Sequence, residues 1–314
     1  MGVVAGIYTI FALGVQLQFG YTGLLNFGHV AFMAIGAYTM AILVVKTDTP
    51  LWLASLAAIG VAILFGVVLG LPTLRLRADY LAITTIAFSE IIRYIAHNEY
   101  RLTGGAQGTS SLGPEGQATT YDASWRSFQG RIEDFLKDHL DEAVSKDVAM
   151  LVIVWVVALV LLAILHGLVR SPWGRVLKAI RDDEEAAAAL GKNVFWYKLQ
   201  SLVIGAALGA VAGLFYAFQF SFFSPGDFEP LITFFAWTIV ILGGTARMWA
   251  VPVGALVFGV IFAGTRFFDF PPFSLLEGAE RAYLRLIVIG LILIGLVAFR
   301  PQGLFGKRQE MVLE

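Results

Sequence analysis

The chain has 314 residues, of which 58% are hydrophobic and only 14% are charged, and its formal net charge is −1. Soluble proteins carry about 25% charged residues, so this composition excludes an ordinary soluble domain and indicates a membrane protein. The near-zero charge argues against nucleic-acid binding, which needs a basic surface. The chain has no Cys for a disulfide framework or thiol catalysis, and its four His show no metal-ligand spacing, so we expect no metal site and no cofactor.

A membrane-spanning helix needs about 20 mostly apolar residues. Nine stretches are candidates, in chain order Val3–Phe19, Gly28–Val45, Leu51–Leu71, Tyr80–Ala96, Val148–Val169, Leu199–Phe220, Leu231–Thr245, Ala250–Arg266 and Tyr283–Phe299. Backbone groups in lipid must be satisfied within the segment, which favours helices. The sequence therefore predicts an all-α, polytopic transmembrane bundle of about 8–10 spans that forms a single domain over residues 1–314.

The segment Gly20–Phe27, between the first two candidates, carries no charge. It is either a tight loop or a break in a helix at membrane depth, and irregular backbone at that depth is tolerated only inside protein or along a cavity. His29 follows at the start of the second span. A satisfied His at the membrane interface is one interpretation, and a place in a solute path or gate with Tyr21 and Asn26 is the other.

Glu90 and Arg93 are charged residues within the fourth candidate span. Residues three apart lie on one face of a helix, in reach of each other. A mutual pair that neutralises both charges near the outer end of the span is the structural interpretation. The alternative is that one of the two lines the solute path.

A small-residue pattern marks the sixth candidate span, where Gly205, Gly209 and Gly213 repeat every four residues on one face. Small residues let helix backbones approach closely in lipid. We expect this face to pack against another helix.

The segment 171–198 is rich in charge and lies between two long apolar stretches. Residues Val176–Leu190 are mostly good helix formers without Pro or Gly, and Gly191 tolerates the left-handed turn that ends a helix. The pattern predicts one short, imperfectly amphipathic helix outside the lipid, with Asp183 on its apolar face. It is either a solvated loop helix or a helix that docks onto another protein. The candidate docking residues are Arg181, Asp182, Glu184, Glu185, Ala186, Ala187 and Gly191.

Lys and Arg in short loops set the orientation of membrane proteins, because they accumulate on the cytoplasmic side. With segment 171–198 in the cytoplasm, alternation of the spans places twelve Lys and Arg on that side and three in the short loops opposite. This asymmetry predicts a cytoplasmic docking helix and C-terminus. The odd number of spans leaves two possibilities open, a further span upstream or a re-entrant candidate.

The long loop 98–147 falls on the outside in this arrangement and is acidic overall. Residues Phe128–Val144 are suited to an amphipathic surface helix. The loop is either simply solvated or contacts an outside partner, for which Gly104 and Gly105 are candidates. Asp227 and Glu229, in a second outside loop, are candidates for the same contact.

Several stretches together resemble one family of membrane proteins. They are Gly20–His29 with Gly36–Tyr38, Arg77–Ile83 with Phe88–Arg93, Leu102–Gly105, Gly174–Gly191 and Phe299–Gly306. The combination is similar to the membrane permeases of branched-chain amino acid ABC importers, over almost the whole chain. Of the two paralogous permeases in that family, the chain resembles the one with R-x-D-Y and F-x-E-I-x-R stretches. Glu185-Ala186-Ala187 followed by Gly191 resembles the family's coupling-helix motif, which fits a cleft on the ATP-hydrolysing subunit.

The resemblance implies a non-catalytic ABC importer permease in the bacterial inner membrane. The implied partners are a paralogous permease in a heterodimer, two cytoplasmic ATP-binding subunits, an external solute-binding protein and the lipid bilayer. The chain itself has no G-x-x-x-x-G-K-[ST] loop for ATP. The implied mechanism is alternating access, and the implied solutes are leucine, isoleucine and valine, with urea, short amides or other amino acids as the alternative.

Two further classes are alternatives to the importer. An ion-coupled secondary carrier is compatible with the broken stretch Gly20–Phe27, but the scarcity of carboxylates within the spans and the docking segment argue against it. A passive channel would not need the docking segment.

Overall fold

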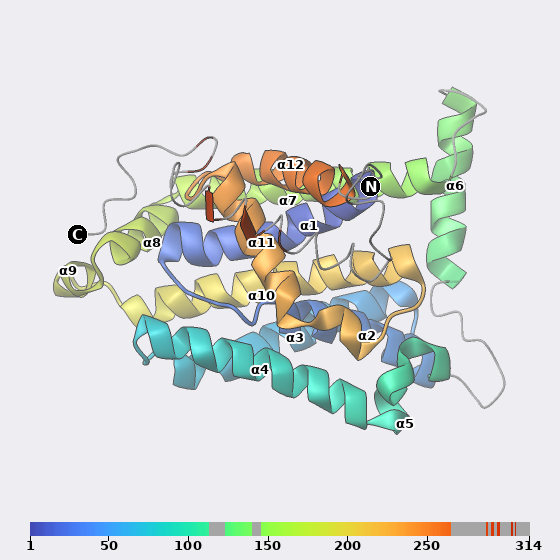
Figure 1. The fold of residues 1–314 in the computed structure, drawn as a ribbon, viewed down its shortest axis with the longest axis horizontal. Helices are drawn as coiled ribbons and strands as arrows, with labels where there is room; N and C mark the ends of the chain where they lie inside the picture. Colours follow the sequence, from blue (N-terminus) through green and yellow to red (C-terminus); the bar gives the residue numbers. More distant parts are fainter. Residues whose placement is uncertain are drawn as a thin grey trace.

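The structure is a computed structural model that describes residues 1–112, 123–139 and 146–264, with a few single residues between 287 and 305. These residues form an all-α fold without a strand, as predicted. Most of the long helices run along the long axis of the molecule (Figure 1). Helix α6 stands across one end, and the short helices α8 and α9 lie at the opposite end (Figure 1).

The elements are long helices joined by turns or by short helices. In chain order they are α1 (Gly2–Val15), the π-helix η1 (Gln16–Tyr21), α2 (Val30–Thr47), α3 (Leu51–Thr73), α4 (Ala78–Asn98), α5 (Tyr100–Thr103), the 3-10 helix η2 (Gly105–Ser111), α6 (Ala123–His139), α7 (Lys146–Arg170), α8 (Pro172–Asp182), α9 (Glu184–Ala189), α10 (Val194–Phe220), the 3-10 helix η3 (Pro225–Phe228), α11 (Pro230–Gly243) and α12 (Ala250–Gly264).

Five of the described helices are long and apolar enough to cross a membrane, namely α1 with η1, α2, α3, α7 and α10. They match the first, second, third, fifth and sixth predicted spans. Helices α11 and α12 match the seventh and eighth but are shorter, at 14 and 15 residues. Helix α4 matches the fourth predicted span and is long enough to cross a membrane, but it is less apolar than these five helices. The ninth predicted span, Tyr283–Phe299, lies almost wholly outside the described residues.

Helix α1 is buried along almost its whole length and packs against α7, α10, α11 and α12. Helix α10 packs against α1, α2 and α3. The predicted close approach at its glycines is confirmed, because a Cβ at Gly213 would collide with the carbonyl oxygen of Met33 in α2. The core therefore depends on backbone contact between helices as well as on side-chain burial.

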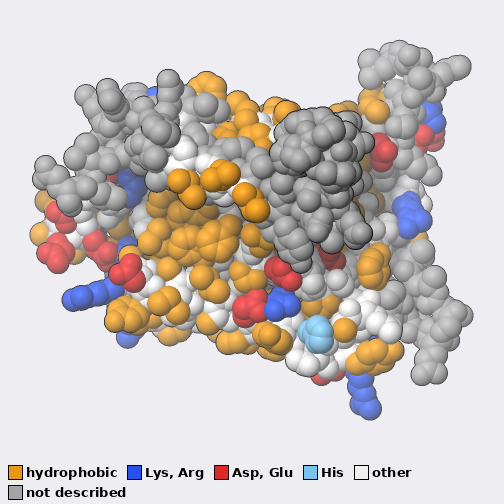
Figure 2. Space-filling model, in the orientation of Figure 1, with side chains coloured by type: hydrophobic (Ala, Val, Ile, Leu, Met, Phe, Trp, Pro, Cys, Tyr) orange, Lys and Arg blue, Asp and Glu red, His pale blue; other side chains and the backbone are white. Residues whose placement is uncertain are grey.

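Apolar side chains cover the flanks of the bundle, and charged side chains gather toward its two ends. Large apolar side chains are exposed along α3, α4 and α7, among them Leu56, Ile91 and Val160. Charged side chains gather at the end that carries α8 and α9, and others lie at the opposite end around α6 (Figure 2). This pattern suits a bundle whose flanks face lipid or another apolar surface and whose ends face water.

Helix α6 confirms the expected amphipathic helix in the long loop, although it begins five residues before the predicted start at Phe128. Trp125 anchors it, with its ring stacked on Phe218 of α10 at a centroid distance of 4.3 Å. The predicted end at Val144 lies outside the described residues.

Candidate functional site: a helix break beside a charged segment

The first helix loses its regular form before α2 begins. Its last turn, Gln16–Tyr21, is a π-helix, and residues 23–28 are irregular. The Leu24 N–H donates to the Gln18 carbonyl oxygen at 2.8 Å, and the Gly23 N–H donates to the Phe19 carbonyl oxygen at 3.0 Å. Between Thr22 and Val30 only Gly23 is exposed. The predicted segment Gly20–Phe27 is therefore a helix break inside the protein rather than a tight surface loop, and residues 16–29 are called the helix break below.

Asn26 holds the centre of the helix break through both its side chain and its main chain. Its Nδ2 donates to Gln18 Oε1 at 3.0 Å, and its Oδ1 accepts the Gly28 N–H at 3.0 Å. Its main-chain oxygen accepts from Trp237 Nε1 of α11 at 3.2 Å. These bonds supply the partners that irregular buried backbone needs.

Three hydroxyl side chains from other helices hydrogen-bond the helix break or Val30, the residue that follows it. Thr85 of α4 accepts the Phe27 N–H at 3.1 Å, and Thr233 of α11 accepts the Val30 N–H at 3.0 Å. Ser201 of α10 hydrogen-bonds the Thr22 hydroxyl at 2.7 Å. Sequence reasoning missed these residues, and the available signal was a hydroxyl within an otherwise apolar span.

His29 is fully buried at the start of α2, between the rings of Phe11 and Phe32 at centroid distances of 4.8 and 5.8 Å. The Phe11 carbonyl faces the ring. Among the described residues, however, neither ring nitrogen has a partner in hydrogen-bond geometry. The described residues therefore leave the ring without a hydrogen bond, and both interpretations of His29, at the membrane interface or on the solute path, stay predictions.

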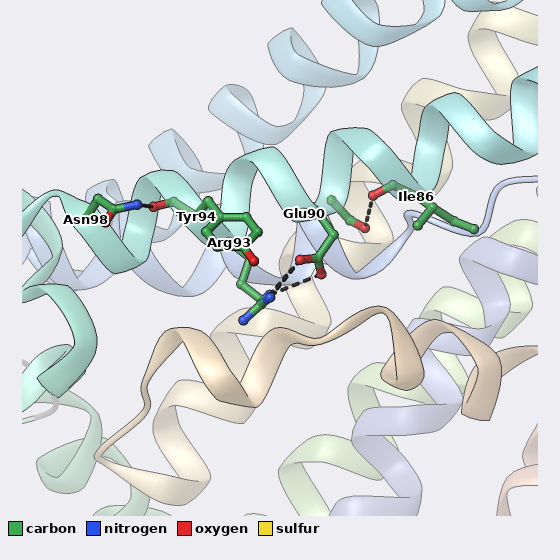
Figure 3. Close-up of polar contacts among 6 residues, drawn as sticks. Ile86, Glu90, Arg93, Tyr94 and Asn98 are labelled. Carbon is green, nitrogen blue, oxygen red and sulfur yellow. Dashed lines mark hydrogen bonds and ion pairs between the residues drawn. The ribbon is translucent and has the colours of Figure 1, made fainter.

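Glu90 and Arg93 form the predicted pair on α4 (Figure 3). Arg93 Nη2 lies 2.6 Å from Glu90 Oε2, and Arg93 Nε lies 3.1 Å from Glu90 Oε1. Both side chains are partly buried and point to the same side of α4 (Figure 3). The pair lies roughly one and a half turns along α4 from Thr85, so it neighbours the helix break without entering it.

The charged segment folds as two helices rather than the single predicted helix Val176–Leu190. Asp183 separates α8 from α9 in an extended conformation, with φ −156° and ψ 108°. Its carboxylate accepts the Ala186 N–H at 2.9 Å and caps α9. An Asp favours this cap over a helix interior, which is the reason for the error. Leu190, at the end of the predicted helix, is 79% exposed.

The predicted helix end at Gly191 is confirmed. Gly191 has a φ of +77°, and its N–H donates to the Ala188 carbonyl oxygen at 2.9 Å. The Lys192 N–H donates to the Ala187 carbonyl oxygen at 3.2 Å, which completes a Schellman motif. Ala187 is buried, whereas Glu185 and Ala186 are exposed.

Contacts from α8 join the charged segment to the helix break. Arg181 Nη1 donates to the Gly20 carbonyl oxygen at 2.7 Å, and its Nε and Nη2 donate to Asp182 Oδ1 at 3.0 and 2.9 Å. Glu184 pairs with Lys198 of α10. A cavity of about 230 Å³ lies beside these contacts, lined among others by Thr22, Arg77, Asp183 and Lys198.

The four candidates for an outside contact serve the chain's own turns. Gly104 and Gly105 are buried and have φ of +81° and +62° after α5. Asp227 forms a capping box with Ser224, whose N–H donates to its Oδ2 at 2.7 Å. Glu229 is the N-cap residue of α11. Their contact with a partner stays a prediction.

The residues that the structure describes contain no group of three or more His, Cys, Asp or Glu arranged to hold a metal ion. What they contain is a set of apolar spanning helices around a buried, hydrogen-bonded helix break. These features define a multi-pass α-helical membrane protein.

The model of the family described as branched-chain amino acid transport system / permease component matches residues 2–297. The chain therefore belongs to this family of transport permeases.

Curated relatives agree with the family. The high-affinity branched-chain amino acid transport system permease protein LivM of Escherichia coli K12 is 34% identical over 305 residues, which cover 95% of this chain and 67% of the relative. A probable LivM of Methanocaldococcus jannaschii is 25% identical, over 96% of this chain and 91% of the relative. The permease protein LivH of Escherichia coli K12 is 25% identical, over 86% and 87%. No solved structure matches this chain.

Proposed function

We propose that this chain is the membrane-spanning, non-catalytic permease subunit of an ATP-driven importer of branched-chain amino acids. The family and the names of the relatives support the solute class. The observation that carries the ATP-driven part is the charged segment, which folds as the helices α8 and α9 at one end of the bundle with Glu185 exposed. That arrangement suits docking onto an ATP-binding subunit.

The proposed assembly contains a second, paralogous permease, two ATP-binding subunits and an external solute-binding protein. Similarity to both LivM and LivH supports a pair of permeases. The chain forms one domain over residues 1–314 in the bacterial inner membrane. Segment 171–198 and the C-terminus lie in the cytoplasm, and loop 98–147 lies outside.

In the proposed mechanism, ATP binding closes the two ATP-binding subunits and moves α8 and α9. The spans then alternate between an outward-open and an inward-open state. ATP biases this equilibrium only to the extent that the ATP-binding subunits have different affinities for the two states. The candidate residues for the solute path or gate are Tyr21, Asn26 and His29 in the helix break, and Glu90 and Arg93 beside it.

One observation favours a second class of transporter. The break between α1 and α2 resembles the discontinuous helices that ion-coupled carriers place around their ion and solute sites. Urea, short amides or other amino acids are the alternative solutes within the importer class.

The decisive experiment measures uptake of labelled leucine into proteoliposomes that hold this chain with the products of its neighbouring genes. We expect uptake that requires both ATP on the side of α8 and α9 and the solute-binding protein on the other side. Uptake driven by an ion gradient without ATP would overturn the importer in favour of the carrier. Uptake of urea or another amino acid, but not leucine, would change the solute and keep the class.

A further inference from the structure

We propose that Arg181 and Lys178 of α8 transmit movement of the charged segment directly to the helix break, while a different face of the segment binds the ATP-binding subunit. This inference rests on the proposed function and assigns to Arg181 an inward, positioning role. Two side chains of α8 then connect the charged segment, which moves when ATP binds, to the buried helix break.

Arg181 supplies a hydrogen bond that the helix break lacks. In a regular α-helix the Leu24 N–H would donate to the Gly20 carbonyl oxygen, but here it donates to the Gln18 carbonyl oxygen. Arg181 Nη1 donates to the Gly20 oxygen in its place, at 2.7 Å. A guanidinium on a carbonyl oxygen is a charge-assisted bond, stronger than a neutral one.

The Arg181 side chain is held in this position. Its Nε and Nη2 both donate to Asp182 Oδ1, and its Cγ would lie 3.3 Å from a Cβ built on Gly23. Only 19% of the side chain is exposed. Arg181 is therefore largely committed to contacts inside this chain.

Lys178 provides a second contact nearly one turn earlier on α8. Its Nζ lies 5.3 Å from the centroid of the Tyr21 ring, which is itself buried. Leu177 and Ile180 are also buried, so α8 is seated firmly against the bundle. Helix α8 thus contacts two adjacent residues of the helix break, Gly20 and Tyr21.

The part of the helix break that α8 contacts is suited to a change of backbone conformation. Residues 16–21 are a π-helix, a form that occurs as single wide turns and is frequent at functional sites. From there the hydrogen bonds of Asn26 lead on to α11 through Trp237. A shift of α8 therefore reaches the helix break and α11 through a continuous set of contacts.

The face left for the ATP-binding subunit is separate from this inward face. Glu185 and Ala186 are exposed, and Glu184 is tied to Lys198 of α10. Docking and transmission therefore depend on different residues, which makes them separable by substitution.

The test is Arg181→Met in the assembled transporter, measured as solute imported per ATP hydrolysed. Met retains the apolar stem beside Gly23 and removes the donors. We expect the ATP-binding subunits to co-purify as they do with the unmodified chain. The ratio of solute imported to ATP hydrolysed should fall roughly tenfold, which corresponds to the free energy of one lost charge-assisted hydrogen bond. A merely structural defect would reduce assembly without changing the ratio of the assembled fraction. Arg175→Met, at an exposed arginine of the same helix, is the matched control and should keep the ratio.

An unchanged ratio in Arg181→Met would overturn the inference while leaving the proposed function intact. If that variant does not assemble, Lys178→Met decides in the same way, because it removes the cation–π contact with the Tyr21 ring and keeps the Arg181 bond. If the unmodified transporter shows no ATP-driven uptake, the proposed function has failed and the inference falls with it.

Discussion

Asn26 and Trp237 meet at the centre of the helix break, where the indole Nε1 donates to the Asn26 main-chain oxygen at 3.2 Å. The Trp237 ring also stacks on Phe27, with centroids 4.7 Å apart, and lies 4.3 Å from the Phe19 ring. One side chain of α11 therefore joins hydrogen bonding and aromatic packing on both sides of Asn26. This contact makes the conformation of the helix break dependent on the position of α11.

Trp237→Phe should destabilise the protein. Phe retains most of the ring contact but removes the donor, which leaves a buried carbonyl oxygen unsatisfied at a cost of about 1–3 kcal/mol. We expect a lower midpoint of thermal unfolding in detergent. Trp196→Phe, at an exposed tryptophan near the start of α10, is the control and should leave the midpoint unchanged. Equal midpoints for the two variants would contradict the structural role of this bond.

Gly213→Ala should disturb the contact between α10 and α2. The added Cβ collides with the Met33 carbonyl oxygen, and because that atom is backbone the helices must separate. We expect a loss of about 1–3 kcal/mol, the usual cost of overpacking, seen as lower yield of folded protein and a lower unfolding midpoint. Gly60→Ala is the matched control, since the same change in α3 meets open space. A loss in both variants would point to a general effect of the substitution.

Glu185→Arg should weaken docking of the ATP-binding subunit while leaving insertion of this chain into the membrane intact. Glu185 is exposed on α9, where a reversed charge has little effect on the fold but a direct effect on a partner surface. The measurement is co-purification of the ATP-binding subunit with the tagged permease. Glu99→Arg reverses a charge at the N-cap of α5, outside the charged segment, and should co-purify normally. Normal co-purification of Glu185→Arg would remove this residue from the docking surface.

His29→Leu separates stability from transport. Both ring nitrogens lack a partner in hydrogen-bond geometry among the described residues, so an apolar side chain of similar size should keep or raise the unfolding midpoint. If His29 lies on the solute path, the same variant lowers leucine uptake. Uptake equal to that of the unmodified transporter, at equal amounts of assembled complex, would exclude His29 from the path.

The sequence was sufficient for features that depend on neighbouring residues. The helices at the first eight apolar stretches, the pair of Glu90 and Arg93 three residues apart, and the helix end at Gly191 are all local, and all are present. The bonds that define the helix break are not local. The hydrogen bonds of Thr85, Ser201 and Thr233 span 58, 179 and 203 residues of sequence. A local sequence pattern does not predict contacts over such separations.

The error in the charged segment has a physical cause. Asp183 interrupts the predicted helix because its carboxylate competes for a backbone N–H at a helix start, a choice that the apolar periodicity of the segment does not reveal. The full burial of the His29 ring was likewise not visible in the local pattern. Its burial depends on α1 and α10 closing around it, with Gly14 and Gly209 leaving room for the ring.

The wide separation of the residues that satisfy the helix break has a consequence for biosynthesis. The first two helices are made early, but Thr233 and Trp237 of α11 are among the last described residues to leave the ribosome. Until then the irregular stretch has backbone groups without their final partners, which is costly in lipid. The amino-terminal part of the chain is thus completed only when α11 arrives, so nascent chains truncated before Pro230 should be early targets for proteolysis.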